Sequence, residues 1–318
     1  MPQIIEKAYA KLNLALLFDN VSKELEDGRK LHIVSSPVVT LDFYNIFKFT
    51  KSETDNPETD NIEVVINTDN KWILQNMKKL TGPEGNCWKT VEFLQNETGK
   101  KLPIRMEIEY NLPLSGGLGG SAADMAAILR GVNRFYDLGY SIDDLAKLGY
   151  KLGSDVPFCV YNYPYAHIGG TGEIIKKIES NALDGYQVIL AFPQITIPLS
   201  KTKSAFKAYD NCPSILPNES IKEGFSNFEL MLKSGRFEPK FLCNCFLLKD
   251  IPWRNEVLAV MNSLNNSNIP FKFVGMAGAG PTVFAVCKSI ELGNLPKKVM
   301  FEGKEIPLTY TITTILRK

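Results

Sequence analysis

At 318 residues the chain is long enough for two domains, and its 36 basic and 35 acidic residues leave a formal net charge of +1. A near-neutral chain without a basic run weighs against nucleic acid or an anionic membrane as the main partner. The first apolar stretch contains Glu6, Lys7 and Lys11, which a signal peptide would not, and no apolar run has transmembrane length. We therefore expect a cytoplasmic protein. Six cysteines lie apart without a C-x-x-C pair, which predicts reduced thiols and neither a disulfide framework nor a zinc site: Cys87, Cys159, Cys212, Cys243, Cys245 and Cys287.

Over the first hundred residues, predicted strands come first and predicted helices follow. Strands are predicted at 4–18 (a pair, or one long bent strand), 33–49 and 62–66. Helical spacing predicts helices at 71–80 and 87–98, separated by the breaker Thr-Gly-Pro-Glu-Gly. The polar residues 50–61 are predicted to form a surface loop.

A glycine-rich stretch follows, from Asn111 to Asp124. Ile104 to Tyr110 alternates apolar and polar residues, as a half-buried strand does, and residues 122–132 have helical spacing. Four glycines lie between them, and a residue without Cβ lets a ligand approach the backbone closely. The helix start adds unpaired N–H groups and the positive end of the macrodipole. The sequence therefore predicts a phosphate site at this strand-to-helix turn.

Other glycine motifs fit the stretch less well. A P-loop needs a Lys before Ser121, and Gly120 stands there. Residues 117–122 match the dinucleotide pattern G-x-G-x-x-A, with Asp137 at the distance of a ribose-binding acid. That fold needs a second strand, whereas 141–152 is predicted as a second helix, with Ser141 as N-cap. A glycine turn that binds no ligand stays a possible interpretation.

Two charged residues each have two possible roles. Lys11 lies in an apolar run, either facing solvent or pointing into a cleft toward an anionic or hydroxyl group. Asp155 follows a predicted helix end at Gly153 and precedes Pro157, which disfavours helix at Val156. Its carboxylate would either cap the turn or be held at a cleft by the stiff proline.

The remaining chain is predicted mostly as strands joined by turns. A second glycine turn is predicted at 166–173, a loop at 211–220, and a third small-residue turn at 275–280. Strands are predicted at 187–192 with a continuation through 195–200, at 271–274, at 282–287 and at 308–316. Helices are predicted around 222–234 and 253–266.

Several separated motifs agree with one family. They are Ala10-Lys-Leu-Asn-Leu14 with Asp27-Gly28 and His32, the stretch Pro113 to Asp124, Leu152-Gly-Ser-Asp-Val-Pro-Phe158, Gly170-Thr-Gly-Glu173, and Gly275 to Thr282. This ordered set resembles the GHMP kinase superfamily. Within it, the set is most similar to the branch that phosphorylates the 2-hydroxyl of a diphosphocytidyl methylerythritol in non-mevalonate isoprenoid biosynthesis.

The resemblance implies a role for each motif. Lys11 and Asp155 would be catalytic, with Asp155 accepting the proton of the substrate hydroxyl and Lys11 offsetting negative charge beside it. Asn13, His32, Asp155 and Gly278 would bind the substrate, with His32 at the cytosine. Ser121 would lie nearest to Mg²⁺. The ATP phosphates would be wrapped by Pro113, Leu114, Ser115, Gly116, Gly117, Leu118, Gly119, Gly120, Ser121, Ala122 and Ala123.

The resemblance also implies an α+β fold of two domains. Residues 1–180 would form an ATP-binding domain like domain 2 of ribosomal protein S5, and 181–318 a C-terminal domain like an α/β plait. Partners would be ATP, Mg²⁺ and a small cytidyl substrate, without nucleic acid or membrane, in a monomer or homodimer.

The chain departs from the family pattern at several places. A loop hydroxyl is missing at Ala122 and Ala123, and Asn244-Cys245-Phe246 stands where the family often has N-D-F. Leu31 replaces the tyrosine before His32, for which Phe206 would be a substitute stacking face, and the spacing from Gly28 to His32 is longer. A homoserine- or mevalonate-type kinase and a catalytically silent nucleotide-binding relative therefore stay open.

Overall fold

The computed structural model describes residues 3–24, 28, 30–52, 61–198, 201–211, 219–237, 242–248 and 250–317. Asp27, Cys212 and most of the two loops predicted at 50–61 and 211–220 lie outside these ranges. The described chain forms two compact units. The first contains Met1–Ala10, Phe43–Leu112 and Gly120–Asn162, and the second contains Lys11–Asp42, Pro113–Gly119 and Tyr163–Lys318.

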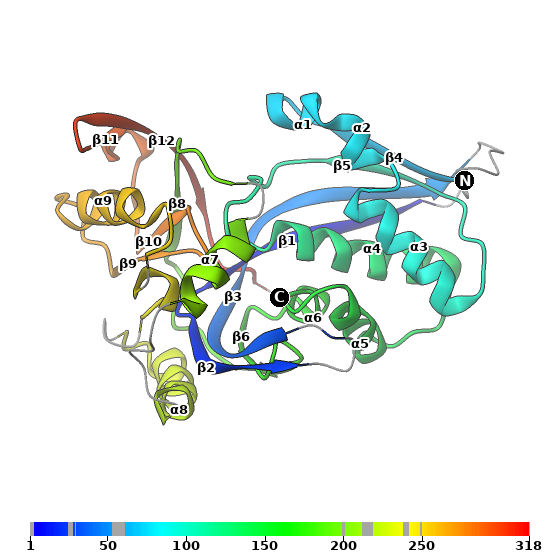
Figure 1. Ribbon diagram of the computed structural model, residues 1–318, viewed down its shortest axis with the longest axis horizontal. Coiled ribbons are helices and arrows are strands. Elements are labelled where there is room, and N and C mark those ends of the chain that lie inside the picture. The colour runs from blue at the N-terminus through cyan, green and yellow to red at the C-terminus, as the bar shows by residue number, and fades with distance from the viewer. Residues whose placement is uncertain are drawn as a thin grey trace. The chain divides into compact units, whose positions relative to one another are not determined.

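The first unit combines a small sheet with helices (Figure 1). Its strands are β4 (Ile62–Asn67), which is parallel to β5 (Ile104–Glu109), and the last part of β3 (Lys30–Lys51), which is antiparallel to β5. Most of β1 (Ile4–Asn13) also lies in this unit. Its helices are α1 (Lys71–Gln75), α2 (Met77–Thr81), α3 (Asn86–Thr98), α4 (Gly120–Tyr136), α5 (Ile142–Leu152) and α6 (Val156–Tyr161).

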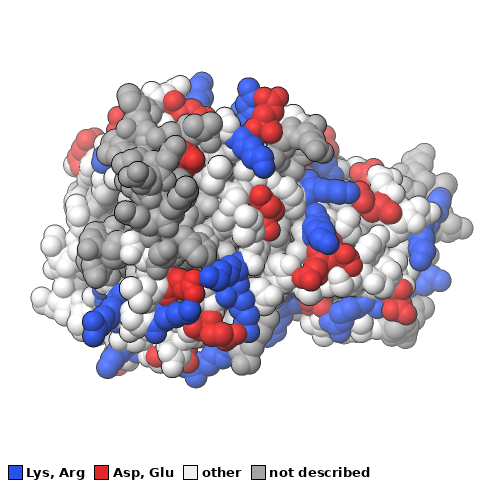
Figure 2. Space-filling model, turned by 90° about the horizontal axis from the view of Figure 1, so that it is seen from below, with Lys and Arg blue, Asp and Glu red and all other residues white. Residues whose placement is uncertain are grey.

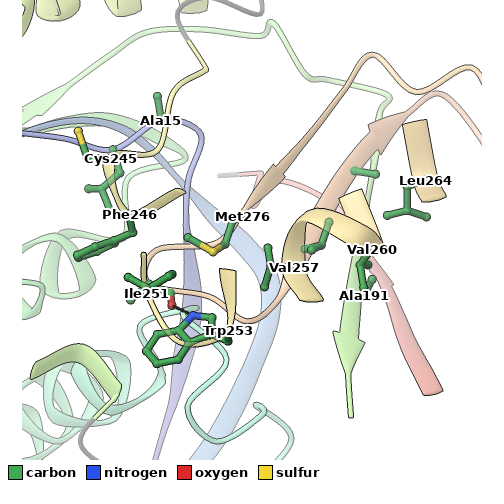
Figure 3. Packing of buried hydrophobic residues seen from close by; sticks show 14 of the residues in the cluster. Ala15, Ala191, Cys245, Phe246, Ile251, Trp253, Val257, Val260, Leu264 and Met276 are labelled. Carbon is green, nitrogen blue, oxygen red and sulfur yellow. Dashed lines mark hydrogen bonds between the residues drawn. The ribbon is translucent and has the colours of Figure 1, made fainter. Parts of the chain in front are cut away.

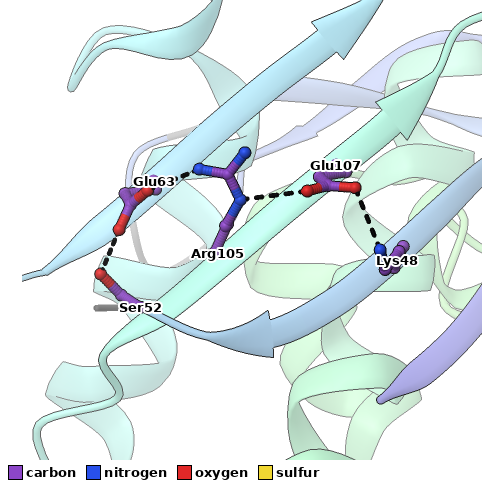
Figure 4. Close-up of polar contacts among 5 residues, drawn as sticks. All are labelled: Lys48, Ser52, Glu63, Arg105 and Glu107. Atoms are coloured by element: carbon purple, nitrogen blue, oxygen red, sulfur yellow. Dashed lines mark hydrogen bonds and ion pairs between the residues drawn. The ribbon is translucent and has the colours of Figure 1, made fainter. Parts of the chain in front are cut away.

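A chain of polar side chains links the three strands of this sheet, as Figure 4 shows. Lys48 on β3 donates to Glu107 on β5, whose other oxygen accepts from Arg105. Arg105 also donates to Glu63 on β4, and Glu63 accepts from Ser52. The hydrogen bonds from Arg105, and then from Lys48, lower the pKa of Glu107. Such partly exposed pairs fix strand register more than they add stability.

The second unit contains two sets of strands. β2 (Leu17–Glu24) and β6 (Tyr165–Gly169) pair with the first part of β3, and β7 (Ile174–Lys177) pairs with β6. The other sheet has the order β11-β12-β8-β10-β9 and is antiparallel throughout. Its strands are β8 (Gln187–Pro193), β9 (Phe273–Met276), β10 (Val283–Cys287), β11 (Lys298–Phe301) and β12 (Lys304–Thr313). The helices are α7 (Lys201–Asp210), α8 (Glu219–Ser234), α9 (Arg254–Asn265) and the short 3₁₀ turns η3 (Cys245–Leu248) and η4 (Leu292–Asn294).

The core of the second unit lies between this antiparallel sheet and its helices. The buried cluster includes Val257 and Val260 of α9, Met276 and Trp253, which are labelled in Figure 3. The indole Nε1 of Trp253 donates to the carbonyl of Ala279 at 2.9 Å, so a core side chain also holds the turn after β9. Burying such apolar side chains supplies the main driving force for folding.

Most predicted elements are confirmed, including the strand at 104–110 and the two successive helices after the glycine stretch. Ser141 and Asp144 form a complete capping box at the start of α5. Because α5 follows α4 without an intervening strand, the dinucleotide-binding interpretation is excluded.

Three predictions about local structure are wrong. Helix α6 begins at Val156, because Pro157 occupies the first turn, where its missing N–H costs nothing. The described residues 194–198 are not a strand, and β8 ends at Pro193. The helix predicted at 71–80 is interrupted at Asn76 into α1 and α2. The turn predicted at 166–173 is confined to 170–173, because β6 extends to Gly169. Strand β6, helix α7 and strand β11 have no counterpart in the prediction.

The surface agrees with the nearly balanced composition. On the face shown in Figure 2, basic and acidic side chains of the described residues are interspersed over the surface. None of the described helices combines the length and the apolar character that a membrane span requires. Among the described cysteines none forms a disulfide, as the sequence predicts.

Candidate active site

The glycine loop 113–119 packs against the third glycine turn, 275–280, in the second unit. Ser115, Gly117 and Gly119 all have positive φ angles, of 56°, 84° and 69°. A Cβ on Gly117 would lie 2.1 Å from the Ala277 carbonyl oxygen, and one on Gly278 would lie 2.8 Å from the Gly117 oxygen. Gly117 and Gly278 therefore allow two turns to touch, in addition to any ligand that they admit.

This close approach predicts a large effect of a single methyl group. We expect Gly117→Ala to lower the free energy of unfolding by about 2 kcal/mol or more, because the new Cβ meets a backbone oxygen at an unfavourable φ. Chemical denaturation measures this loss. Gly185→Ala is the control, since its φ is also positive, at 76°, but its Cβ would meet no atom within 4 Å. Equal losses in the two variants would show that backbone strain alone, and not the packing of the two turns, requires glycine at 117.

Lys11 lies beside the same loop. The residue is only 5% exposed, so the alternative of a solvent-facing lysine is wrong. Its backbone N–H donates to Leu118 O at 2.9 Å, and a Cβ on Gly119 would lie 2.6 Å from its Cγ. The side chain therefore runs directly along the glycine loop, which places a cation where the sequence predicts phosphate binding.

A short hydrogen-bond chain fixes the end of this lysine. Lys11 Nζ donates to Asn13 Oδ1 at 2.7 Å, and Asn13 Nδ2 donates to Ser36 Oγ at 2.8 Å. The Ser36 hydroxyl in turn donates to the Ala15 carbonyl at 2.6 Å. The side chains of Lys11, Asn13 and Ser36 are all buried. The series of hydrogen bonds therefore orients the ammonium group of Lys11 and also gives it an acceptor. The structure thus brings two predicted site residues, Lys11 and Asn13, into direct contact.

A second buried lysine, which the sequence analysis missed, bridges the two glycine turns. Lys201 begins α7 and is 6% exposed. Its Nζ donates to the Ser115 carbonyl at 2.7 Å and to the Gly280 carbonyl. Burial, and then the positive charge of Lys11, lower the pKa of Lys201 to about 8. Nothing in the local pattern around 201 indicates burial, because both acceptors are about 80 residues away in sequence.

His32 packs face to face with Phe206. The two rings are nearly parallel, at 4°, with centroids 5.6 Å apart. The His32 side chain is 8% exposed; Nδ1 contacts the Asp19 carbonyl at 2.9 Å and Nε2 contacts Asp210 Oδ1 at 2.7 Å. Both neighbours are acceptors, so both contacts are hydrogen bonds only when the ring carries two protons. The structure therefore places Phe206 against His32, while stacking of Phe206 on the cytosine stays a prediction.

The remaining loop residues open helix α4 in the first unit. Gly120, Ser121, Ala122 and Ala123 form its first turn, where backbone N–H groups have no intrahelical acceptor. Asn86 Nδ2 donates to the Ser121 hydroxyl at 2.6 Å, which fixes that oxygen. This helix start is suited to an anion through its N–H groups and dipole.

Behind this turn lies a buried carboxyl group, Asp124. Asn45 Nδ2 donates to Asp124 Oδ1 at 2.8 Å, and Tyr110 also hydrogen-bonds to the carboxyl group. Asn45 Oδ1 accepts from the backbone N–H groups of Asn111 and Leu112, both at 2.8 Å. Burial raises the pKa of Asp124 to about 7, against the effect of the hydrogen bonds from Asn45 and Tyr110. The cluster ties the end of β5 to α4 on either side of the glycine loop.

Asp155 occupies the N-cap position of α6 in the first unit. Its side chain makes no capping hydrogen bond, so the interpretation of Asp155 as a helix cap is wrong. The residue is partly exposed. A carboxylate that does not serve its own helix is consistent with a role toward a ligand.

Comparison with known proteins identifies the family. Residues 86–163, which include the glycine stretch and Asp155, match the family described as GHMP kinases N terminal domain. The chain is 30% identical over 282 residues to 4-diphosphocytidyl-2-C-methyl-D-erythritol kinase of Caldicellulosiruptor bescii, covering 88% of each chain. The chain belongs to the GHMP kinases.

Solved structures agree with this family in fold. A crystal structure of 4-(cytidine 5'-diphospho)-2C-methyl-D-erythritol kinase superposes with a TM-score of 0.62 at 20% identity, covering 90% of each chain. Homoserine kinase from Cytophaga hutchinsonii superposes with a TM-score of 0.68 at 14% identity, covering 99% of this chain and 95% of the other. At these identities the structures support the fold only. The predicted family and the two-domain α+β fold of this GHMP kinase are confirmed.

The predicted site residues of the GHMP kinase fall into two groups. Lys11, Asn13, His32, Gly278 and residues 113–119 belong to the second unit, whereas Asp155 and residues 120–123 belong to the first. Within the second unit, the loop 113–119 contacts Lys11 and the turn that contains Gly278. A meeting of Lys11 with Asp155 stays a prediction.

Proposed function

We propose that this GHMP kinase transfers the γ-phosphoryl group of ATP to the 2-hydroxyl of 4-diphosphocytidyl-2-C-methyl-D-erythritol. The observation that carries the proposal is the buried Lys11, fixed by Asn13 directly against the glycine loop. The relative from C. bescii, named for this kinase activity, supports the choice of acceptor, since the similarity extends over 88% of both chains.

The roles proposed for the reacting groups follow from charge. The loop 113–123 holds the triphosphate through the backbone N–H groups that follow Pro113, because the triphosphate needs donors and neutralisation more than covalent chemistry. The Asp155 carboxylate orients the substrate hydroxyl and takes its proton as the new O–P bond forms and the bond from the γ-phosphorus to ADP breaks. Lys11 offsets the negative charge that the transferring group and Asp155 share. Asn13 orients the ammonium group of Lys11 and contacts the substrate.

Mg²⁺ is the proposed metal, with Ser121 as its nearest protein group. The Ser121 oxygen accepts one hydrogen bond from Asn86 and keeps a second lone pair. Among the described residues no cluster of three or more His, Cys, Asp or Glu side chains could hold a metal. A site with few protein ligands fits Mg²⁺, which usually keeps waters and binds through substrate phosphates. When bound, the ion would neutralise charge on those phosphates.

The cytosine is proposed to bind at His32 and Phe206. A base held between two ring faces needs a separation of about 7 Å, twice a carbon contact of about 3.5 Å. The observed centroid distance is 5.6 Å, so the base either separates the rings or stacks on one of them. We expect Phe206→Ala to raise the KM for the cytidyl substrate about tenfold and to leave the KM for ATP unchanged. Steady-state kinetics with each substrate varied in turn measures both constants; a matched rise in both would contradict this assignment.

Further properties are proposed on the same basis. Residues 1–180 and 181–318 would be the two domains. The compact units are divided differently, because residues 11–42, 113–119 and 163–180 group with the second. Gly278 would contact the substrate. The protein would act in the cytoplasm as a monomer or homodimer, without nucleic acid or membrane partners.

A substrate panel tests the proposed function. The protein is incubated with ATP and, separately, the cytidyl substrate, homoserine and mevalonate, and ADP release and the phosphorylated product are measured. We expect turnover with the cytidyl substrate alone. Turnover with another alcohol in its place would assign a different GHMP reaction, and turnover with none would favour a catalytically silent relative.

A further inference from the structure

Lys201 has an unusual environment for a lysine that only stabilises the fold. Its ammonium group is buried between the loop 113–119 and the turn 275–280. Both of its hydrogen-bond acceptors are neutral main-chain carbonyls. Within the described part of the chain, the hydrogen bonds of Nζ go to these two carbonyls and to no carboxylate, and the charged group that lowers its pKa is another cation, Lys11. A cation buried against neutral carbonyls is stabilised when an anion comes within its reach.

The chemistry of the neighbouring groups indicates which anion this is. An ammonium group has three N–H donors, and two of them go to Ser115 and Gly280. The loop to which Lys201 is bonded is the one that the proposed function assigns to the ATP phosphates. We propose that Lys201 is a second phosphate-binding lysine, which acts with Lys11 on the triphosphate of the nucleotide while it holds the two glycine turns together. This inference rests on the proposed function.

The test must distinguish phosphate binding from the alternative that Lys201 only holds the two glycine turns together. A purely structural role would support binding of the whole nucleotide, including base and sugar. A phosphate-binding cation would affect only ligands that carry phosphate. ATP and adenosine therefore make a matched pair of probes. Ligand-observed NMR titration measures both affinities, including weak ones.

We expect Lys201→Gln to raise the Kd for ATP about tenfold or more and to leave that for adenosine within about twofold. Lys201→Arg retains the charge and should restore most of the affinity for ATP. Lys207→Gln is the charge-matched control, because Lys207 lies on the same helix with an exposed side chain. Equal weakening of ATP and adenosine, or no change for ATP, would overturn the proposal.

The pH dependence of ATP binding by the wild-type protein gives a second readout, which does not require that Lys201→Gln folds. Burial and Lys11 lower the pKa of Lys201 to about 8. Lys11 on β1 is the charged group that faces Lys201. Neither glycine turn contains a titratable side chain, and η3 contributes Cys245. The other titratable residues of α7 are Lys203, Lys207, Tyr209 and Asp210. ATP affinity, relative to adenosine, should fall as pH rises through 8 in the wild type and stay level in Lys201→Arg. The same profile in both proteins would overturn the proposal.

Failure of the proposed function would look different. A wild-type protein that binds ATP but does not phosphorylate the cytidyl substrate contradicts the proposed acceptor. In that protein the difference between ATP and adenosine on Lys201→Gln still tests the phosphate-binding role.

Discussion

Replacing Asp155 by Asn should lower kcat by about 10²- to 10⁴-fold and leave the affinity for ATP nearly unchanged. The amide keeps the size of the side chain but cannot accept the proton of the substrate hydroxyl at neutral pH. The carboxylate makes no capping hydrogen bond in α6, so the exchange removes no such bond from that helix. Single-turnover kinetics with saturating ATP and cytidyl substrate, together with equilibrium binding of ATP, separates the chemical step from binding.

Asp137→Asn is the matched control for this experiment. Asp137 is an exposed carboxylate of the same unit, with a φ of 48° that asparagine adopts readily. It is also the acid that the excluded dinucleotide-binding interpretation would have placed at a ribose. We expect the kcat and the ATP affinity of the Asp137→Asn enzyme to match those of the wild type. An Asp155→Asn enzyme with an unchanged rate would show that another group accepts the proton.

The parts of the fold that the sequence predicts well depend on local signals. The capping box of Ser141 and Asp144 is complete within four residues, and it forms as predicted. The period of the strand at 104–110 and the glycines after it are equally local, so the strand-loop-helix order of the site could be predicted. Pro157 shows the limit of such rules, because the same residue that disfavours helix before it also fits the first turn of α6.

The parts of the site that were missed depend on contacts between distant segments. Lys201 follows a stretch that alternates like a strand, and only its acceptors at Ser115 and Gly280 reveal that it is buried. The stacking of His32 on Phe206 joins residues 174 positions apart. Asn45 is likewise an ordinary polar residue in a predicted strand until its contact with Asp124 is seen. Periodicity reports which face of an element is apolar, and carries no information about which distant polar group meets it.

The buried carboxyl group of Asp124 should make stability depend on pH. Its pKa rises from an ordinary value near 3.8 to about 7 in the folded protein, because burial disfavours the charged form. The folded state therefore binds the proton more tightly than the unfolded state does. This contribution is complete below pH 3.8, and it is lost as pH rises through 7, where the folded protein must hold a buried charge. The loss amounts to about 4 kcal/mol of unfolding free energy.

Asp124→Asn should remove this dependence. The amide is neutral at every pH, it can accept from Asn45 through its oxygen, and it leaves the hydrogen bonds of Asn45 to Asn111 and Leu112 in place. We expect the variant to match the wild type near pH 4 and to be more stable, by up to about 4 kcal/mol, above pH 7. Urea denaturation from pH 4 to 9 measures the difference, with the exposed Glu92→Gln as the control for loss of a negative charge. Parallel stability curves for wild type and Asp124→Asn would mean that the folded protein holds Asp124 with its ordinary proton affinity, and that the cluster joining β5 to α4 carries a negative charge at neutral pH.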